Sequence, residues 1–230
     1  MTRDPFEDFL QKHTVSTHPP LCPEILTLEA RDLVPLWEEV EKLAGSEVEP
    51  PFWAYSWPGG QALARYVLDC PAWVRGKVVL DLGCGNGIAG IAAAKAGARR
   101  VIACDVDPSA LRMTEIHASR NQVAVEGEPR DLLEAPPPVP PVEVILAGDL
   151  FYAREMARRV EGWLVSAAAC RAEILVGDPG RAYLPAKGLD LLETYQVPVS
   201  PEVESVEVRQ TRVFKFAPRD SAPSRKDAAG

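Results

Sequence analysis

The sequence predicts an α/β protein built on a mainly parallel, doubly wound sheet. From residue 76 onward, apolar runs of strand length alternate with helical patterns, and the connections between them are short. Such alternation produces parallel strands whose crossover helices cover both faces of a sheet. Several of the runs end at an aspartate, where a polar sheet edge is expected. The chain of 230 residues is 47% hydrophobic and 25% charged, which suits one soluble domain with a substantial core.

The residues before this alternation predict an extension rather than more of the sheet. Residues 1–22 are polar and are expected to form a flexible N-terminus. In the predicted extension, residues 23–75, residues 26–43 indicate a short apolar stretch and an amphipathic helix, and residues 61–68 indicate a second helix. Between them, residues 50–60 are dense in aromatic side chains and turn formers. Taken alone, such a segment is more typical of a core than of a pocket.

The predicted core spans residues 76–217. Its strands are expected at residues 78–80, 100–104, 123–130, 142–147 and 173–177, and its helices at residues 88–96, 109–120 and 153–169. Gly127 and Pro129 weaken the third strand. Apolar and charged side chains alternate late in the core, which predicts a half-exposed antiparallel pair over residues 196–200 and 205–216.

Two segments are expected to lie outside regular structure. Residues 136–141 form a proline-rich spacer, for which a plain connector is favoured over a ligand of SH3 domains. Residues 218–230 are charged and rich in Ala, Pro and Ser, which predicts a disordered tail.

Composition disfavours several classes of function. The formal net charge of −8 repels phosphate backbones and suits a partner with a basic patch, so nucleic-acid binding is not expected. No apolar run reaches the roughly 18 residues of a membrane span. The N-terminus is too acidic for a signal or transit peptide, and the five cysteines show neither a C-x-x-C pair nor a zinc spacing. We expect a cytoplasmic monomer with reduced thiols, no membrane contact and no metal.

The strongest local signal is a strand that runs into three glycines and then a helix. Asp81, Gly83, Gly85 and Gly87 form the pattern D-x-G-x-G-x-G. Glycines let the backbone turn sharply and let a ligand approach closely. The helix N-terminus that follows presents free N–H groups and partial positive charge. This glycine loop therefore predicts a cofactor site.

Two cofactors compete for the glycine loop. Its later glycines also fit G-x-G-x-x-G, and Asp105 follows about 20 residues further on, which matches the dinucleotide fingerprint. Asp81 decides against this reading, because a carboxylate at the strand end would repel a pyrophosphate. S-adenosylmethionine (SAM) instead brings an ammonium and a sulfonium, which a carboxylate favours. We therefore expect SAM rather than NAD, with Asp81, Gly83 and Gly85 among its binding residues.

Acidic residues also follow the neighbouring strands, at the edge where an open α/β sheet binds its ligand. Asp105 is expected to accept hydrogen bonds from ribose hydroxyls. Asp131 follows the third strand, where it either receives the adenine amino group or is a solvated loop residue. Asp149, Phe151 and Tyr152 follow the fourth strand, where aromatic rings would line the site of a cationic methyl donor. The alternative is that both rings are packing residues and Asp149 caps a helix.

Three further motifs make a specific resemblance. They are Pro51-Phe52-Trp53-Ala54-x-x-Trp57-Pro58-Gly59-Gly60-Gln61-Ala62-Leu63-x-Arg65-Tyr66, the D-x-x-Y element in Gly148-Asp149-x-Phe151-Tyr152, and Val176-Gly177-Asp178-Pro179-Gly180-Arg181. Together with the glycine loop they resemble the protein-lysine methyltransferases of family 16, over about residues 23–217. The proline-rich spacer and the tail depart from this family but touch none of its motifs.

The resemblance implies a fold, an activity and a substrate. The fold is the seven-stranded, Rossmann-like sheet of class I SAM-dependent methyltransferases, with an N-terminal helical extension. The activity is methyl transfer to lysines of the β subunit of electron transfer flavoprotein, with ribosomal proteins as a second substrate class. Trp57 is then expected at the cofactor, Asp149 is expected to bind and orient the incoming lysine, and Tyr152 is expected to position its amine. An NAD-dependent oxidoreductase is the less favoured alternative.

Overall fold

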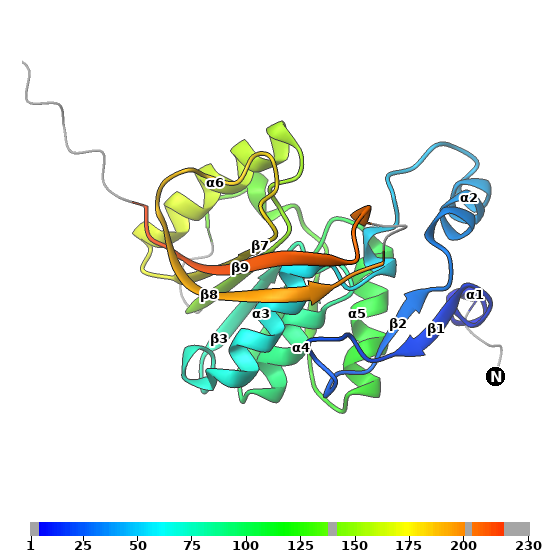
Figure 1. Ribbon diagram of the computed structural model, residues 1–230, viewed down its shortest axis with the longest axis horizontal. Helices are drawn as coiled ribbons and strands as arrows, with labels where there is room; N and C mark the ends of the chain where they lie inside the picture. Colours follow the sequence, from blue (N-terminus) through cyan, green and yellow to red (C-terminus); the bar gives the residue numbers. More distant parts are fainter. Residues whose placement is uncertain (1–4, 138–141, 201–203, 219–230) are drawn as a thin grey trace, which may run out of the picture.

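A seven-stranded sheet forms the centre of the molecule in the computed structural model, which describes residues 5–137, 142–200 and 204–218 (Figure 1). The strand order is β5-β4-β3-β6-β7-β9-β8. The strands are β3 (Val78–Leu82), β4 (Arg100–Cys104), β5 (Glu126–Glu128), β6 (Val144–Gly148), β7 (Glu173–Asp178), β8 (Leu189–Pro198) and β9 (Val208–Phe216). The strands from β5 to β7 in this order pair in parallel, whereas β9 is antiparallel to both of its neighbours. The predicted seven-stranded, mostly parallel sheet is thus confirmed.

Helices cover both faces of this sheet. The helices are α3 (Pro58–Asp69), α4 (Ile88–Lys95), α5 (Pro108–Arg120) and α6 (Arg154–Ala169). Helices α3, α4 and α5 lie on one face and α6 lies on the other (Figure 1). Two apolar clusters fill the spaces between helices and sheet, one on each face. The sheet is therefore doubly wound, as the alternation of strands and helices predicts.

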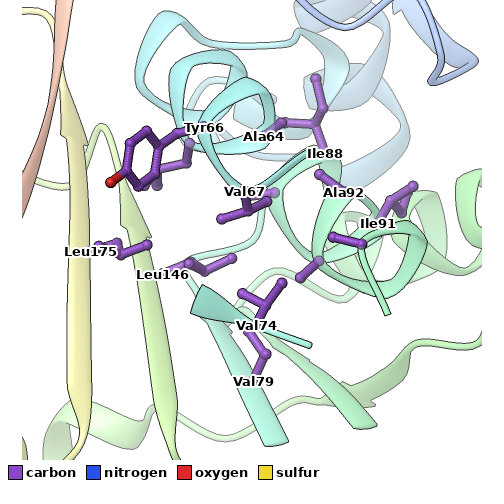
Figure 2. Close-up of a cluster of buried hydrophobic side chains, with 14 of the residues drawn as sticks. Ala64, Tyr66, Val67, Val74, Val79, Ile88, Ile91, Ala92, Leu146 and Leu175 are labelled. Carbon is purple, nitrogen blue, oxygen red and sulfur yellow. The ribbon is translucent and has the colours of Figure 1, made fainter. Parts of the chain in front are cut away.

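The central strand β3 is buried along its whole length because both of its faces are covered. Val79 packs with Leu146 and Leu175 of neighbouring strands beneath α3 and α4 (Figure 2). Leu80 and Leu82 point to the opposite face, into the cluster beneath α6. Side chains alternate across a strand, so an uninterrupted apolar run marks a strand with a core on each side.

The two edge strands differ most from prediction. Strand β5 is much shorter than the predicted residues 123–130, since Gly127 weakens a strand and Pro129 cannot donate to a ladder. Strand β8 begins at Leu189, earlier than the predicted start at residue 196. Its pairing with β9 shifts register between Leu191 and Glu193. A half-exposed, irregular edge strand carries no continuous apolar run, which is why the sequence pattern understated it.

The prediction of a flexible N-terminus over residues 1–22 is wrong from Pro5 onward. The structure has α1 (Pro5–His13), β1 (Thr14–Thr17), β2 (Thr27–Ala30) and α2 (Leu33–Ala44), with β1 and β2 paired antiparallel. Leu10 of α1 is buried, and the Phe6 ring lies 5.7 Å from the Trp53 ring. Phe6, Phe9 and Leu10 share one helix face, so this short and mostly polar segment still has an apolar stripe to bury.

The extension before residue 76 is built into the core, because α3 packs directly on the sheet face. The predicted domain boundaries after residues 22, 75 and 217 stay predictions. Residues 1–4 of the predicted flexible N-terminus, 138–141 of the proline-rich spacer and 219–230 of the predicted tail lie outside the described residues.

Candidate functional site

The glycine loop connects β3 to α4 through left-handed backbone. Gly83, Gly85 and Gly87 have φ angles of 63°, 53° and 78°. Residues that carry a Cβ rarely adopt this region. A Cβ on Gly87 would also lie 2.5 Å from the methyl carbon of Thr114, so position 87 excludes a side chain for a second reason. The loop is therefore a specific backbone shape and not a generic turn.

Side chains from three other elements hold the glycine loop. Asp105, directly after β4, accepts a hydrogen bond from the Gly85 N–H at 2.9 Å. The side chain of Asn86 donates to Ser56 Oγ at 2.7 Å, which ties the loop to the aromatic segment. His117 of α5 meets the backbone oxygen of Asn86 through Nδ1 at 2.9 Å. The loop is thus shaped by protein contacts on three sides.

His117 also connects the glycine loop to the N-terminal strand β2. Its Nε2 lies 2.8 Å from the backbone nitrogen of Leu28, which can only donate. Nε2 must therefore accept, so Nδ1 carries the proton and donates to Asn86, and the ring is neutral. Burial lowers the pKa of His117 to about 4. Sequence reasoning gave His117 no role, although a histidine on the buried face of a predicted helix was a visible signal.

Asp81, within β3, lies next to the start of α4. The residue is only 3% exposed, and its Oδ2 accepts from the Gly90 N–H in the first turn of α4 at 2.7 Å. Asp81 thereby satisfies one of the unpaired N–H groups at the helix start. Burial raises its pKa to about 7. That this carboxylate also faces a cationic ligand stays a prediction.

The carboxylates of Asp105 and Asp131 differ in the partners that they already bind within the protein. Asp105 accepts a backbone N–H from the glycine loop at Oδ2 and another from Asp107 at Oδ1, 3.0 Å away. A carboxylate has about four acceptor positions, so Asp105 keeps capacity for a ligand. Asp131 accepts from the Leu133 N–H at 2.9 Å and forms an ion pair with Arg159 of α6 at 2.7 Å. Asp131 therefore already bridges a loop and a helix.

Aromatic side chains form a wall beside the glycine loop. The Phe52 ring lies 5.8 Å from that of Trp57 and 5.4 Å from that of Tyr152. The backbone oxygen of Phe52 accepts from the Trp57 indole at 2.7 Å and lies 3.9 Å from where a Cβ on Gly85 would be. Tyr152 is 44% exposed, whereas Phe151 is fully buried. The packing alternative therefore applies to Phe151, and Tyr152 belongs to the wall.

Asp149, directly after β6, caps helix α3. Its Oδ2 accepts from the Gly59 N–H at 2.5 Å and from the Gly60 N–H at 3.2 Å, whereas the side chain of the N-cap residue Trp57 makes no capping bond to the helix. Its Oδ1 accepts from Nη2 of Arg181 at 2.8 Å and from Nε at 3.3 Å. Four donors thus fill about four acceptor positions. Asp149 is itself left-handed, with φ of 57°.

The start of α3 can approach the sheet this closely only because both surfaces lack side chains. A Cβ on Gly59 would overlap the backbone oxygen of Gly177 in β7, and a Cβ on Gly177 would overlap the backbone oxygen of Gly59. A Cβ on Gly148 would lie 3.1 Å from the Gly60 nitrogen. The Trp-Pro-Gly-Gly motif is therefore explained by this contact, which brings Trp57 and Asp149 together.

A buried ionic cluster lies beyond Asp149. Arg181 bridges Asp149 Oδ1 and Glu204 Oε1, both at 2.8 Å from Nη2, and its guanidinium carbon lies 5.7 Å from the centre of the Trp57 ring. Arg209 holds the other oxygen of Glu204 at 2.9 Å. Sequence reasoning assigned no role to Arg181 or Glu204. The position of Arg181 just after a strand end was a usable signal, whereas Glu204 had none.

Opposing effects act on the carboxylates of this cluster. Burial raises the pKa of Asp149 to about 6, although Arg181 pulls it down. Asp178, at the end of β7, accepts from the N–H groups of Gly180 and Arg181 at 2.7 and 2.6 Å. Its Oδ2 is buried without a hydrogen-bond partner among the described residues, and burial raises its pKa. The cluster therefore contains carboxylates that are expensive to ionise.

In the described ranges, no helix is long and apolar enough to cross a membrane. Within the same ranges, no three His, Cys, Asp or Glu residues form a group that could hold a metal ion. All five cysteines are unpaired, and Cys170 is exposed.

Known proteins are similar to this chain in sequence and in fold. Residues 66–150 match the family model described as ribosomal protein L11 methyltransferase (PrmA). The electron transfer flavoprotein beta subunit lysine methyltransferase of Xenopus laevis is 35% identical over 216 residues, covering 91% of this chain and 86% of the relative. The protein of the same name from Mus musculus is 34% identical over 221 residues, covering 91% of this chain and 84% of the relative.

A solved structure supports the fold. The tRNA (uracil-54, C5)-methyltransferase of Pyrococcus abyssi, in complex with S-adenosyl-L-homocysteine, superposes with a TM-score of 0.53. It is 15% identical, and the match covers 88% of this chain and 44% of that chain. At this identity the likeness concerns the fold alone.

Proposed function

Because the chain belongs to the family of electron transfer flavoprotein beta subunit lysine methyltransferases, we propose that it methylates lysine side chains of the flavoprotein's beta subunit. The family and the fold make the chain a SAM-dependent protein-lysine methyltransferase. The observation that carries the choice of substrate is the 35% identity over 91% of the chain. The net charge of −8 agrees with a partner that presents a basic, lysine-bearing surface.

The residues of the glycine loop fit SAM as its cofactor. Gly83 is exposed, and a Cβ on Gly85 would find its nearest neighbour only at 3.9 Å, so the open side of the loop is bare backbone. We propose that this backbone and the free acceptor capacity of Asp105 hold the cofactor, with Asp105 on the ribose. In this proposal Trp57 lies at the sulfonium end and Asp131 at the adenine end. Asp81 then acts by supporting the start of α4.

When bound, SAM supplies an electrophilic methyl group, which only a neutral lysine amine can attack. A lysine of pKa about 10.4 is neutral in about one molecule in 2,500 at pH 7, a cost of about 4.6 kcal/mol. The lysine ammonium would first lose one proton to water, and the neutral nitrogen would then take the methyl group from the sulfonium, whose sulfur keeps the electron pair of the broken bond. The protein must therefore desolvate the ammonium and align the amine, and both effects favour transfer.

We propose that Asp149 and Tyr152 serve this alignment. The acceptor positions of Asp149 are filled by Gly59, Gly60 and Arg181, so its role is to place negative charge near the lysine and to fix α3. Tyr152 is the exposed member of the aromatic wall, and it is proposed to line the approach of the amine.

Mass spectrometry on purified components tests the proposal. The chain is incubated with SAM and recombinant electron transfer flavoprotein, and peptides of both flavoprotein subunits are mapped. We expect whole methyl increments on lysines of the beta subunit and none on the alpha subunit. Omission of SAM and replacement of SAM by its demethylated product are the controls. An unmodified beta subunit at saturating SAM would contradict the proposal.

Ribosomal protein L11 is the second candidate substrate, because the L11 methyltransferase model matches residues 66–150. The same assay therefore includes purified L11 in a parallel arm. Methylation of L11 with an unmodified flavoprotein would favour this second candidate. Methylation of the flavoprotein alone would exclude it.

A further inference from the structure

Among the described residues, the carboxylate of Asp149 is held by one charged partner. Its Oδ2 accepts from backbone N–H groups of α3, and its Oδ1 accepts from Arg181. The N–H groups at a helix start stabilise the negative charge of the carboxylate. They bond to Oδ2 and do not hold Oδ1 in one direction. The orientation of Oδ1 therefore depends on Arg181.

Arg181 is itself fixed at both ends. Its backbone N–H donates to Asp178 Oδ1 at 2.6 Å, directly after β7. Its guanidinium is shared between Asp149 and Glu204 and lies over Trp57, and its side chain is 20% exposed. A planar guanidinium can hold two carboxylates in fixed directions, which a lysine ammonium cannot do. Arg181 thus links the end of β7 to Glu204 and holds Asp149 between them.

Negative groups outnumber positive ones around Asp149 even with Arg181 present, and Arg181 is in contact with Asp149. Asp149, Asp178 and Glu204 carry three negative charges, against the two positive charges of Arg181 and Arg209. Helix α3 faces Asp149 with backbone N–H groups. Loss of Arg181 would leave Asp149 beside Asp178 with no cation in contact. A buried carboxylate in such surroundings takes up a proton.

We propose that Arg181 is a positioning residue for methyl transfer, which fixes the Asp149 carboxylate in one orientation and links it to Glu204 ahead of β9. This inference rests on the proposed methyltransferase function, in which Asp149 places charge near the lysine. Arg181 touches neither the methyl group nor the amine in this proposal. Its effect reaches the reaction through Asp149 and through the ring of Trp57.

Three variants test the proposal. Arg181→Met removes the charge and keeps much of the apolar stem, and Arg181→Lys keeps the charge but loses the planar fork. Arg209→Met is the matched control, since Arg209 also pairs with Glu204 but, in the described part of the chain, makes its bonds to Glu204 and not to Asp149. The measurements are kcat and KM with the flavoprotein, SAM affinity by calorimetry, and the titration of the Asp149 carboxyl carbon by NMR in the absence of substrate.

We expect Arg181→Met to lower kcat by about 10- to 100-fold, the range for lost alignment, with SAM affinity within about threefold of wild type. Its Asp149 carboxyl should titrate at a higher pH than in wild type, because the cation that favours the anion is gone. Arg181→Lys should recover part of both effects. Arg209→Met should leave the Asp149 titration unchanged.

The outcomes separate this proposal from the proposed function. A wild-type enzyme that leaves the flavoprotein unmodified contradicts the substrate, while the NMR titration still decides whether Arg181 governs Asp149. Wild-type kcat and an unchanged Asp149 titration in Arg181→Met overturn the positioning role. An equal loss of kcat in Arg209→Met also overturns it, because the cluster would then be merely structural. If Arg181→Met does not fold, Arg181→Lys carries the same comparison.

Discussion

The two sides of the candidate site are held by different forces. The glycine loop is held by hydrogen bonds, from Asn86 to Ser56, from His117 to the loop backbone and from Gly85 to the carboxylate of Asp105. The side that carries Asp149 is held by a buried ionic cluster with Arg181 and Glu204. A hydrogen bond between neutral groups loses little free energy on burial. A buried charge loses much more hydration free energy, which its partners must offset. Substitutions at the glycine loop are therefore expected to disturb the structure less than substitutions in the ionic cluster around Asp149.

On both sides of the site, an aspartate accepts N–H groups at the start of a helix, but the surroundings of the two aspartates differ. Asp81, within β3, accepts an N–H from the first turn of α4, and Asp149, directly after β6, caps α3. Asp81 accepts one N–H and is enclosed, and its pKa rises to about 7. Asp149 is less enclosed, with its side chain 11% exposed, and accepts two N–H groups and a guanidinium; burial raises its pKa to about 6, although Arg181 lowers it. Arg181 therefore favours the ionised form of Asp149.

The largest effect is expected from Asp149→Ala, which breaks the ionic side alone. The change leaves the first turn of α3 uncapped and Arg181 with one carboxylate. We expect the free energy of unfolding to fall by about 3 kcal/mol, the low end for breaking a buried pair, because Arg181 keeps Glu204. Methyl transfer should fall at least about 100-fold through lost alignment, with SAM affinity nearly unchanged. Urea denaturation, calorimetry and the mass-spectrometric assay measure these three quantities.

Glu155→Ala is the matched control for this prediction. Glu155 pairs with Arg158 on the exposed face of α6, so its removal should leave stability and transfer at wild-type values. Full activity of Asp149→Ala on the true substrate would show that the transfer side is misplaced.

A smaller, pH-dependent effect is expected from His117→Gln at the glycine loop. The folded pKa of about 4 lies below the ordinary 6.5, so the unfolded chain binds a proton between these pH values that the folded chain does not. The stability due to His117 is therefore complete above pH 6.5 and is lost as the pH falls to 4, by about 3 kcal/mol in total. The wild type should be more stable than His117→Gln at pH 7, and this gap should close toward pH 4.

The gap between the two proteins, and not the wild-type curve, is the quantity to measure. The raised pKa values of Asp81 and Asp149 act with the opposite sign, since these groups bind protons more readily in the folded chain. Both carboxylates are present in each protein, so their effects cancel in the difference. A gap of constant size from pH 7 to 4 would contradict a neutral, buried His117.

The smallest effect is expected from Asp105→Ala, which tests the cofactor without touching the ionic cluster. Loss of hydrogen bonds from a charged acceptor should weaken SAM binding by about 10- to 100-fold, or about 1.5–3 kcal/mol. Calorimetry measures this affinity. Asp107→Ala is the matched control, because Asp107 caps α5 through Ser109 and should cost stability but not affinity. Unchanged affinity in a folded Asp105→Ala protein would remove the ribose assignment.

Much of the fold was predictable because its central strands are buried on both faces. The strand expected at residues 100–104 is β4 as observed, and the helix expected at 109–120 is α5 with one more residue at its start. The edge strands and α1 were not predicted well. Each of them buries only part of its surface, so its hydrophobic pattern is short and resembles a loop.

In the candidate site, too, some features follow from the local sequence and others do not. The shape of the glycine loop and the place of Asp105 follow from local pattern, because strand ends and left-handed glycines are properties of short segments. The side-chain directions did not follow. Asp81 was expected to bind the cofactor, and its Oδ2 accepts from the start of α4. Asp149 was expected to bind and orient the lysine, and its oxygens accept from the start of α3 and from Arg181.

By itself the sequence determined the order of strands along the chain, the glycine loop and the acidic residues at the strand ends, since periodicity and backbone conformation are local. Only the tertiary structure decided which donors those acidic residues receive. Asp149 is 90 residues from Gly59 and 32 from Arg181, and the three meet because the sheet sets β6 beside β7 while side-chain-free backbone lets α3 reach both. A buried charge takes its properties from whatever surrounds it in space, and that neighbourhood is not written in adjacent residues.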